Sequence, residues 1–217
     1  MTRNLKVFGL TLVAALALSA FVASAASATA FSFKSNTDNP TLTGKQHGTN
    51  VDVFTTDSGT VRCSEATYVG SQAGTSASSV EVAPTYSGCK LLFFINVTID
   101  PNGCKYRFNT VTKEGANFEG NTDIVCPAGK AIEVTAPGCT ITYPAQNGLT
   151  KVTFTNLGTG HTQEVTVDVG ITTGIQYEEH GGTCENETGL TNNGSLTGPS
   201  LFTAENATKE HIGIWVE

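Results

Sequence analysis

Six cysteines constrain this chain more than any other feature. They are even in number and follow an export leader, a combination that predicts a disulfide framework. The alternative is a metal site, but the sequence has no C-x-x-C or H-x(3–5)-H spacing and its four histidines are scattered, which disfavours zinc. We therefore expect three bridges among Cys63, Cys89, Cys104, Cys126, Cys139 and Cys184.

The leader has the layout of a signal peptide. Arg3 and Lys6 precede an apolar run, Val7–Val22, and small residues with A-x-A cleavage sites follow it. The length of the apolar run would also suit a membrane anchor, but its alanine-rich composition and the stacked cleavage sites favour removal. We expect cleavage after Ala28 or Ala30.

A signal peptide over residues 1–30 leaves residues 31–217 as one secreted domain. Removing Arg3 and Lys6 from the 12 basic residues leaves ten against 19 acidic ones, so the mature net charge is −9. Such an acidic surface repels phosphate backbones, and no basic run offsets it. Nucleic acid and anionic membrane are therefore poor candidate partners, and no membrane insertion is expected after the signal is removed.

Apolar residues alternate with polar ones over most of the mature chain, which is the pattern of half-buried strands. The clearest example is Val165–Ile171, where Glu164, Thr166 and Asp168 occupy the other face. No 3.6-residue apolar period persists after residue 30, so little helix is expected. About eleven antiparallel strands predict an all-β fold: a disulfide-stapled, two-sheet β-sandwich, or two packed β-subdomains.

The segment Leu91–Ile99 is apolar on both faces at its start, which predicts a central strand covered on two sides. An extended strand of this length spans about 30 Å and would hold Cys89 and Cys104 too far apart for a bridge. A hairpin that loops near Ser76 places Cys63 opposite Cys89, and one that loops over Gly115–Gly120 places Cys104 opposite Cys126. A strand at Ala131–Thr135 separates Cys126 from Cys139, which leaves Cys139 to pair with Cys184. The favoured pairs are therefore Cys63–Cys89, Cys104–Cys126 and Cys139–Cys184.

No clustered catalytic signature is present. Glu178 and Glu179 adjoin His180, but neighbours on a strand point to opposite faces, which is unsuited to the ~5.5 Å carboxylate pair of a retaining glycosidase. The segment Thr56–Thr60 contains the Asp-Ser-Gly of some serine nucleophiles, yet those residues are also ordinary hairpin-turn residues. If the protein is a hydrolase, Glu178, His180 and His161 are its conceivable participants.

No cofactor is predicted, although calcium held by loop carboxylates remains open. Its candidate ligands are Asp52, Asp100, Glu114, Glu119 and Asp123. Trp215 alternates with Ile214 and Val216 in a predicted terminal strand, so its ring faces away from them. We single out Trp215 as a candidate ligand contact.

Four segments carry a resemblance to known proteins: Gly59-Thr60-Val61-Arg62-Cys63, Pro84-Thr85-Tyr86-Ser87-Gly88-Cys89, Asn102-Gly103-Cys104-Lys105-Tyr106 and Ile212-Gly213-Ile214-Trp215-Val216-Glu217. The chain resembles uncharacterised secreted, cysteine-containing all-β proteins that occur as multiple paralogues in some soil actinobacteria. The resemblance covers most of the mature chain. It implies export and an all-β fold, and it transfers no activity, ligand or catalytic residue.

The preferred hypothesis is a non-enzymatic extracellular β-sandwich with a surface-structural, adhesion or ligand-binding role toward a cell-surface or glycan partner. It is based on the disulfide framework and the absence of clustered chemistry in the sequence. One alternative is an extracellular hydrolase of polysaccharide or peptide. Another is a subunit that self-assembles into a surface layer or fibre through edge strands such as Ile212–Val216. The sequence leaves the ligand and the oligomeric state open.

Overall fold

A computed structural model describes residues 31–48, 52–186 and 189–217, so the expected signal peptide lies outside the described residues. These residues form nineteen strands and one 3-10 turn, η1 (Gly160–Thr162). No helix among them is long and apolar enough to cross a membrane. The strands are β1 (Phe33–Ser35), β2 (Thr41–Gln46), β3 (Val53–Thr56), β4 (Gly59–Arg62), β5 (Glu65–Ser71), β6 (Ser76–Ala77), β7 (Ser79–Ser87), β8 (Lys90–Leu91), β9 (Ile95–Asn96), β10 (Thr98–Asp100), β11 (Lys105–Glu114), β12 (Asn117–Val125), β13 (Ile132–Ala136), β14 (Cys139–Tyr143), β15 (Gln146–Leu157), β16 (Glu164–His180), β17 (Thr191–Glu205), β18 (His211–Ile212) and β19 (Ile214–Val216).

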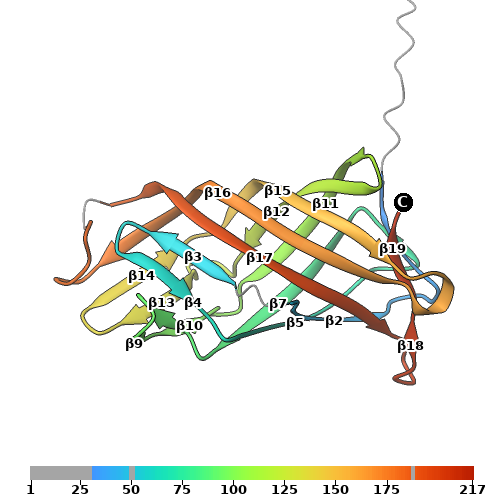
Figure 1. Ribbon diagram of the computed structural model, residues 1–217, viewed down its shortest axis with the longest axis horizontal. Helices are drawn as coiled ribbons and strands as arrows, with labels where there is room; N and C mark the ends of the chain where they lie inside the picture. Colours follow the sequence, from blue (N-terminus) through green and yellow to red (C-terminus); the bar gives the residue numbers. More distant parts are fainter. Residues whose placement is uncertain (1–30, 49–51, 187–188) are drawn as a thin grey trace, which may run out of the picture.

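Eight long strands close into an antiparallel barrel (Figure 1). Around the barrel the order is β2, β5, β7, β11, β12, β15, β16 and β17, which is also their order in the chain. Closure comes from β17, because it pairs with β16 on one edge and with β2 on the other. The prediction of a two-sheet sandwich is therefore wrong. The same alternation of buried and exposed residues is produced by a barrel strand and by a sandwich strand, so the local pattern cannot distinguish them.

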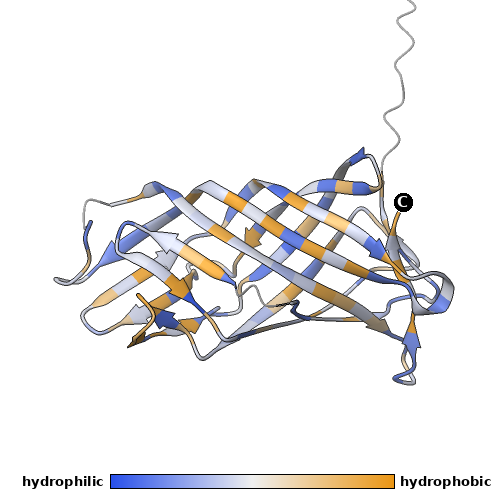
Figure 2. Cartoon of the chain, viewed as in Figure 1, coloured by the Kyte–Doolittle hydropathy of each residue, from blue (hydrophilic) through white to orange (hydrophobic). Residues whose placement is uncertain are grey.

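Apolar side chains fill the barrel. In β16, Val165 and Val167 are buried while Thr166 between them is not, as the alternation predicted. Figure 2 shows the resulting bands of hydrophobic and hydrophilic residues along the long strands. Phe108 of β11 contacts Phe154 of β15 and Phe202 of β17, with ring centroids 6.2 and 6.0 Å away. Since these strands are not neighbours, the rings meet across the interior.

One glycine is required by this packing. The ring of Phe202 lies against Gly44 of the adjacent strand β2, and a Cβ on Gly44 would stand 2.5 Å from the ring. A larger residue would collide with a buried aromatic side chain, so the position accepts only glycine without repacking of the core.

The three insertions that extend the barrel sheet fall at the same end of the barrel, which we call the insertion end. Strands β3 and β4 lie between β2 and β5, strands β8 to β10 lie between β7 and β11, and strands β13 and β14 lie between β12 and β15. Alternate connections of a meander lie at the same end, and these three are alternate connections. The inserted strands extend the sheet beyond the barrel: β3, β4, β8 and β9 follow β17 and form what we call the wing, whereas β14, β13 and β10 follow β16.

The opposite end, which we call the cap end, is closed by a separate three-stranded sheet of β19, β1 and β6. Figure 1 shows the C-terminus and β19 at this end, and β3, β4, β13 and β14 at the other. Asn156 attaches the cap sheet to the barrel, because its side-chain amide donates to the Val216 carbonyl (2.8 Å) and its amide oxygen accepts from the Val216 N–H (2.9 Å).

Three disulfides stabilise the insertion end, and all three predicted pairings are confirmed. They join Cys63 to Cys89, Cys104 to Cys126 and Cys139 to Cys184. Disulfides form and persist in oxidising environments, so the three bridges indicate that the protein belongs to an oxidising compartment.

One premise of the pairing argument is nevertheless wrong. Residues 91–99 do not form one covered strand; they form the short strands β8, β9 and β10 with a hairpin tip between β8 and β9. Leu92, Phe93 and Phe94 at this tip are 46%, 77% and 73% exposed. Their apolar sequence predicted burial, but the backbone turns at Leu92 and Phe93 and leaves the side chains outside the core.

Candidate functional site

The structure brings two of the three candidate hydrolytic residues together and leaves the third apart. Glu178 and His180 share the outer face of β16, where His180 Nε2 lies 3.4 Å from a Glu178 carboxylate oxygen. Glu179 points inward and is buried, as strand alternation requires. His161 lies in η1, in the connection from β15 to β16, which belongs to the cap end.

Trp215 lies in β19 of the cap sheet, half-buried between the buried residues Ile214 and Val216. It lines a cavity of about 20 Å³ together with Phe33 of the cap sheet and Phe202 of the barrel. That space suits one water molecule and is far smaller than the ~300 Å³ of a small-molecule pocket.

The candidate calcium ligands do not gather at one place. Asp52 is inside the barrel and Asp123 is on its outer face, and the described residues contain no group of three or more His, Cys, Asp or Glu side chains that could hold a metal ion. Glu114 and Glu119 interact with each other, and this interaction raises the pKa of Glu119.

Asp52 is a buried carboxyl that forms no ion pair with any of the described residues. Tyr68 donates a 2.5 Å hydrogen bond to Asp52 Oδ2, and burial raises the pKa of Asp52 to about 6. Farther along, the hydroxyls of Tyr86 and Tyr106 lie 2.9 Å apart. The cavity beside Asp52 and Tyr68 measures only about 20 Å³, which is too small for a ligand of metabolite size.

The most unusual exposed surface is the tip of the β8–β9 hairpin, Leu92–Phe94, which we call the tip. Phe93 and Phe94 are more exposed than any other large hydrophobic residue among those described. Leu92 and Phe93 adopt φ angles of 51° and 72°, in the left-handed region that non-glycine residues rarely occupy. Leaving a phenylalanine in water forgoes about 2 kcal/mol of burial, and a left-handed residue costs about 1 kcal/mol more. The fold therefore carries a local energetic cost at this tip.

The tip stands on a rigid base. Cys89 precedes β8 directly and is bridged to Cys63, at the end of β4. Leu91 of β8 pairs with Val61 of β4, and both side chains are buried. The Leu92 N–H donates to the Thr60 carbonyl at 3.1 Å. These contacts fix the base of the hairpin while its apolar tip remains in solvent.

A groove of about 370 Å³ lies beside the tip. Three inserted loops form it: Leu91, Leu92 and Ile95 come from the hairpin, Ala136, Pro137 and Cys139 from the β13–β14 turn, and Thr183 and Glu185 from the β16–β17 loop. The last two loops are joined by the Cys139–Cys184 bridge, and Thr183 Oγ1 donates to the Pro137 carbonyl at 3.0 Å.

Ser58, at the turn between β3 and β4, completes the lining of the groove and fixes the wing to the barrel. Its hydroxyl donates to Glu179 Oε2 at 2.6 Å, and its N–H donates to Glu179 Oε1 at 3.1 Å. The Ser58 hydroxyl also accepts from the Glu185 N–H at 2.9 Å. In the described part of the chain no histidine is hydrogen-bonded to Ser58, so the serine has no imidazole base.

Asp57, the neighbour of Ser58, is fixed in the same way. It accepts hydrogen bonds from the amide groups of Asn186 (3.1 Å) and Asn193 (2.8 Å), which lower the pKa of its carboxyl. The Asp57 N–H donates to the Tyr177 hydroxyl at 3.0 Å. The two residues of the turn therefore serve to position the wing.

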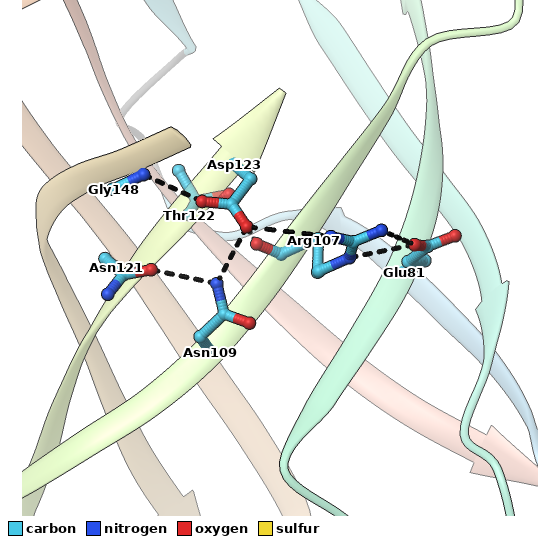
Figure 3. Close-up of polar contacts among 7 residues, drawn as sticks. All are labelled: Glu81, Arg107, Asn109, Asn121, Thr122, Asp123 and Gly148. Carbon is cyan, nitrogen blue, oxygen red and sulfur yellow. Dashed lines mark hydrogen bonds and ion pairs between the residues drawn. The ribbon is translucent and has the colours of Figure 1, made fainter. Parts of the chain in front are cut away.

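The two arginines of the folded domain have opposite electrostatic surroundings. Arg107, on the outer face of the barrel, donates to Glu81 Oε1 from Nε (2.9 Å) and Nη2 (2.7 Å), while its Nη1 lies 3.9 Å from Asp123 (Figure 3). Asp123 in turn accepts from the Gly148 N–H at 2.7 Å and from Asn109 Nδ2 at 3.2 Å. The Arg107 hydrogen bonds lower the pKa of Glu81. The charge of Arg107 is therefore compensated by two carboxylates.

Arg62, in the wing, has no such neutralisation. Its guanidinium carbon lies 5.4 Å from the centroid of the Phe93 ring, and its Nε is buried without a hydrogen-bond partner. Lys90 stands directly opposite Arg62 in the sheet. None of the ion pairs that the described residues form includes either cation. Like charges directly opposite each other destabilise a sheet, so this pair is a second unfavourable feature of the wing.

Sequence reasoning missed the tip and the cation pair. Leu92–Phe94 matches the composition of a buried strand, and only the left-handed backbone reveals the turn. The Lys90–Arg62 register depends on a pairing between segments far apart in the chain. No protein-family model matches the chain, and no curated protein or solved structure shows significant similarity to it.

Proposed function

We propose that this protein is a secreted, non-enzymatic binding protein that attaches to a cell-surface or glycan partner through the tip and the adjacent groove. The carrying observation is the exposure of Phe93 and Phe94 on a left-handed hairpin turn. Selection for stability alone would bury or replace such residues. Exposed aromatic patches usually mark interaction sites instead. The disulfide at the base of the hairpin supports the proposal, since a rigid surface loses less entropy on binding.

The test is a double variant, Phe93→Ser/Phe94→Ser, assayed against a panel of soluble glycans and purified cell-wall material. Both side chains are mostly exposed, so the variant should melt within a few degrees of the wild type. A matched control, Leu157→Ser/Leu190→Ser, removes exposed apolar residues elsewhere. We expect the tip variant to lose binding and the control to keep it. Equal binding by both variants, or no binding of the wild type to any member of the panel, would refute the proposal.

A second candidate function, hydrolysis, is favoured by one contact. Ser58 lines the groove and its hydroxyl donates to the buried carboxylate of Glu179 at 2.6 Å, an arrangement in which a carboxylate could activate a serine. Turnover of a peptide or polysaccharide that disappears in Ser58→Ala, while melting temperature is kept, would establish this function over pure binding. Wild-type protein that binds a glycan and leaves it intact would exclude hydrolysis of that glycan.

A further inference from the structure

We propose that the outer face of the wing binds an acidic glycan, with the carboxylate of a uronic acid seated between Arg62 and Lys90 and its sugar ring stacked on the tip. This inference rests on the proposed binding function and names the chemistry of the partner. It starts from the arrangement of charge on the wing.

Charge complementarity selects an anion. Arg62 and Lys90 lie next to each other on the outer face of the wing. Val61 precedes Arg62 and Leu91 follows Lys90, and both are buried, so alternation along each strand directs the two cations outward. Lys90 Nζ donates to Asn96 Oδ1, a neutral acceptor, so this contact leaves its charge uncompensated. A carboxylate placed between the cations would relieve their repulsion and receive charge-assisted hydrogen bonds from both.

The carboxylates nearest in sequence have other partners. Asp57 lies in the turn at the far end of β4 and is held by Asn186 and Asn193. Glu65, just beyond Cys63, accepts from the Ser87 hydroxyl at 3.1 Å. No carboxylate occurs within β3, β4, β8 or β9. The mature chain carries a net charge of −9, so a polyanion is repelled by most of the surface, and this cationic face is the favourable place for it to bind.

The neighbouring side chains suit a sugar. The ring of Phe93 lies over the Arg62 guanidinium, so an aromatic face and a cation occur at one place. Thr55 and Thr60 lie on the same outer face, with their hydroxyl oxygens 3.3 Å apart, and can exchange hydrogen bonds with sugar hydroxyls. An apolar ring face, several hydroxyls and one carboxylate on the same unit describe a uronic acid. A neutral sugar would leave the cation pair uncompensated, and a simple inorganic anion would leave the tip exposed.

The experiment compares polygalacturonate with the same polymer after methyl esterification, which removes the charge and keeps the sugar backbone. Wild-type protein should bind the acidic polymer at least about tenfold more tightly, since hydrogen bonds to a charged group typically contribute this much or more. Arg62→Gln/Lys90→Gln should abolish that preference and melt at or above the wild-type temperature. Lys45→Gln/Lys130→Gln removes two cations from other positions and should retain it.

The outcomes separate this inference from the proposed function. The acidic-glycan proposal would be overturned if the wild type and Arg62→Gln/Lys90→Gln each bound both polymers equally well. If the tip variant lost binding in the same experiment, the proposed binding surface would still stand. Absence of binding to polygalacturonate would overturn it as well. Binding to vesicles of anionic phospholipid, but not to polygalacturonate, would show that the cations recognise a membrane instead and would also overturn it.

Discussion

The two ends of the barrel treat apolar and polar groups in opposite ways. At the cap end, Phe33 packs its ring against Phe154 at 5.3 Å and is only 7% exposed, and both backbone groups of Val216 are satisfied by Asn156. At the insertion end, Phe93 and Phe94 remain in solvent and two cations face each other without a carboxylate. The cap end closes the barrel, whereas the insertion end presents side chains that the fold itself does not use.

The disulfides belong to the same contrast. All three lie at the insertion end, while the cap end is held without a disulfide, by hydrogen bonds, packing and the ion pair of Lys34 with Glu217 (3.8 Å). The inserted strands are short, and the covalent bridges add to the packing of their buried residues such as Phe54, Ile132 and Ile141. A site assembled from loops needs such support if its side chains are to keep fixed positions.

Reduction of the bridges should have the largest effect on stability. They close loops with sequence separations of 26, 22 and 45 residues, and each is expected to contribute about 3 to 4 kcal/mol in the chain-entropy model. We expect reduced protein to unfold or to lose protection first in the inserted strands, as measured by urea denaturation and amide hydrogen exchange. A reduced sample that melts at the oxidised temperature would show that the bridges are dispensable.

Truncation of one phenylalanine at each end compares the two regions directly. Phe33→Ala should lower the free energy of unfolding by about 3 kcal/mol or more, because the ring is buried against Phe154. Phe94→Ala at the tip should change it by less than about 0.5 kcal/mol. Chemical denaturation of both variants measures this difference, and similar losses in the two would mean that the tip is part of the core.

Asp52 provides a prediction about pH. Its pKa is raised by burial from 3.8 to about 6, so the folded state binds a proton that the unfolded state has released in this window. The sign follows: stability from this group is present below pH 3.8 and is lost as pH rises toward 6, by up to about 3 kcal/mol. Asp52→Asn should remove this decline, and exposed Asp38→Asn should not. Urea titrations at pH 4 and pH 7.5 measure the free energy of unfolding at each pH. An equal change between the two pH values in the wild type and in Asp52→Asn would contradict the prediction.

The smallest expected effect is a gain. Phe93 is 77% exposed with φ of 72°, so Phe93→Gly loses little buried area and relieves a left-handed conformation. We expect the free energy of unfolding to rise by up to about 1 kcal/mol while glycan binding weakens. Phe94→Gly lacks the left-handed φ and should not be stabilising. Loss of stability in Phe93→Gly would show that the ring contributes to folding through Arg62.

Local patterns predicted the strands and the disulfides, because a hairpin with a definable loop fixes which residues lie opposite each other. The pair Cys104–Cys126 follows from the register of Lys105 with Val125, which sequence alone suggests. Barrel closure could not be predicted in this way, since it depends on β17 pairing with β2 from the other end of the chain. The sandwich was therefore the wrong conclusion from a pattern that located the long strands correctly.

The tip escaped prediction for a different reason. Leu91–Ile99 has the composition of a buried strand, and the hydrophobic effect would favour covering it. The chain instead turns at two non-glycine residues, Leu92 and Phe93, for which the sequence carries no turn signal. A departure from local preference of this kind is expected at functional sites. Trp215, chosen from its alternation, proved to lie in the cap sheet.

Amide hydrogen exchange with and without the glycan that binds best in the panel tests the central claim most directly. If the insertion end is the binding surface, exchange should slow at residues 59–62 and 88–97 and remain unchanged in the cap sheet around Trp215. Protection of the cap sheet, or of the outer barrel face around Arg107, with no change at the tip would contradict the account.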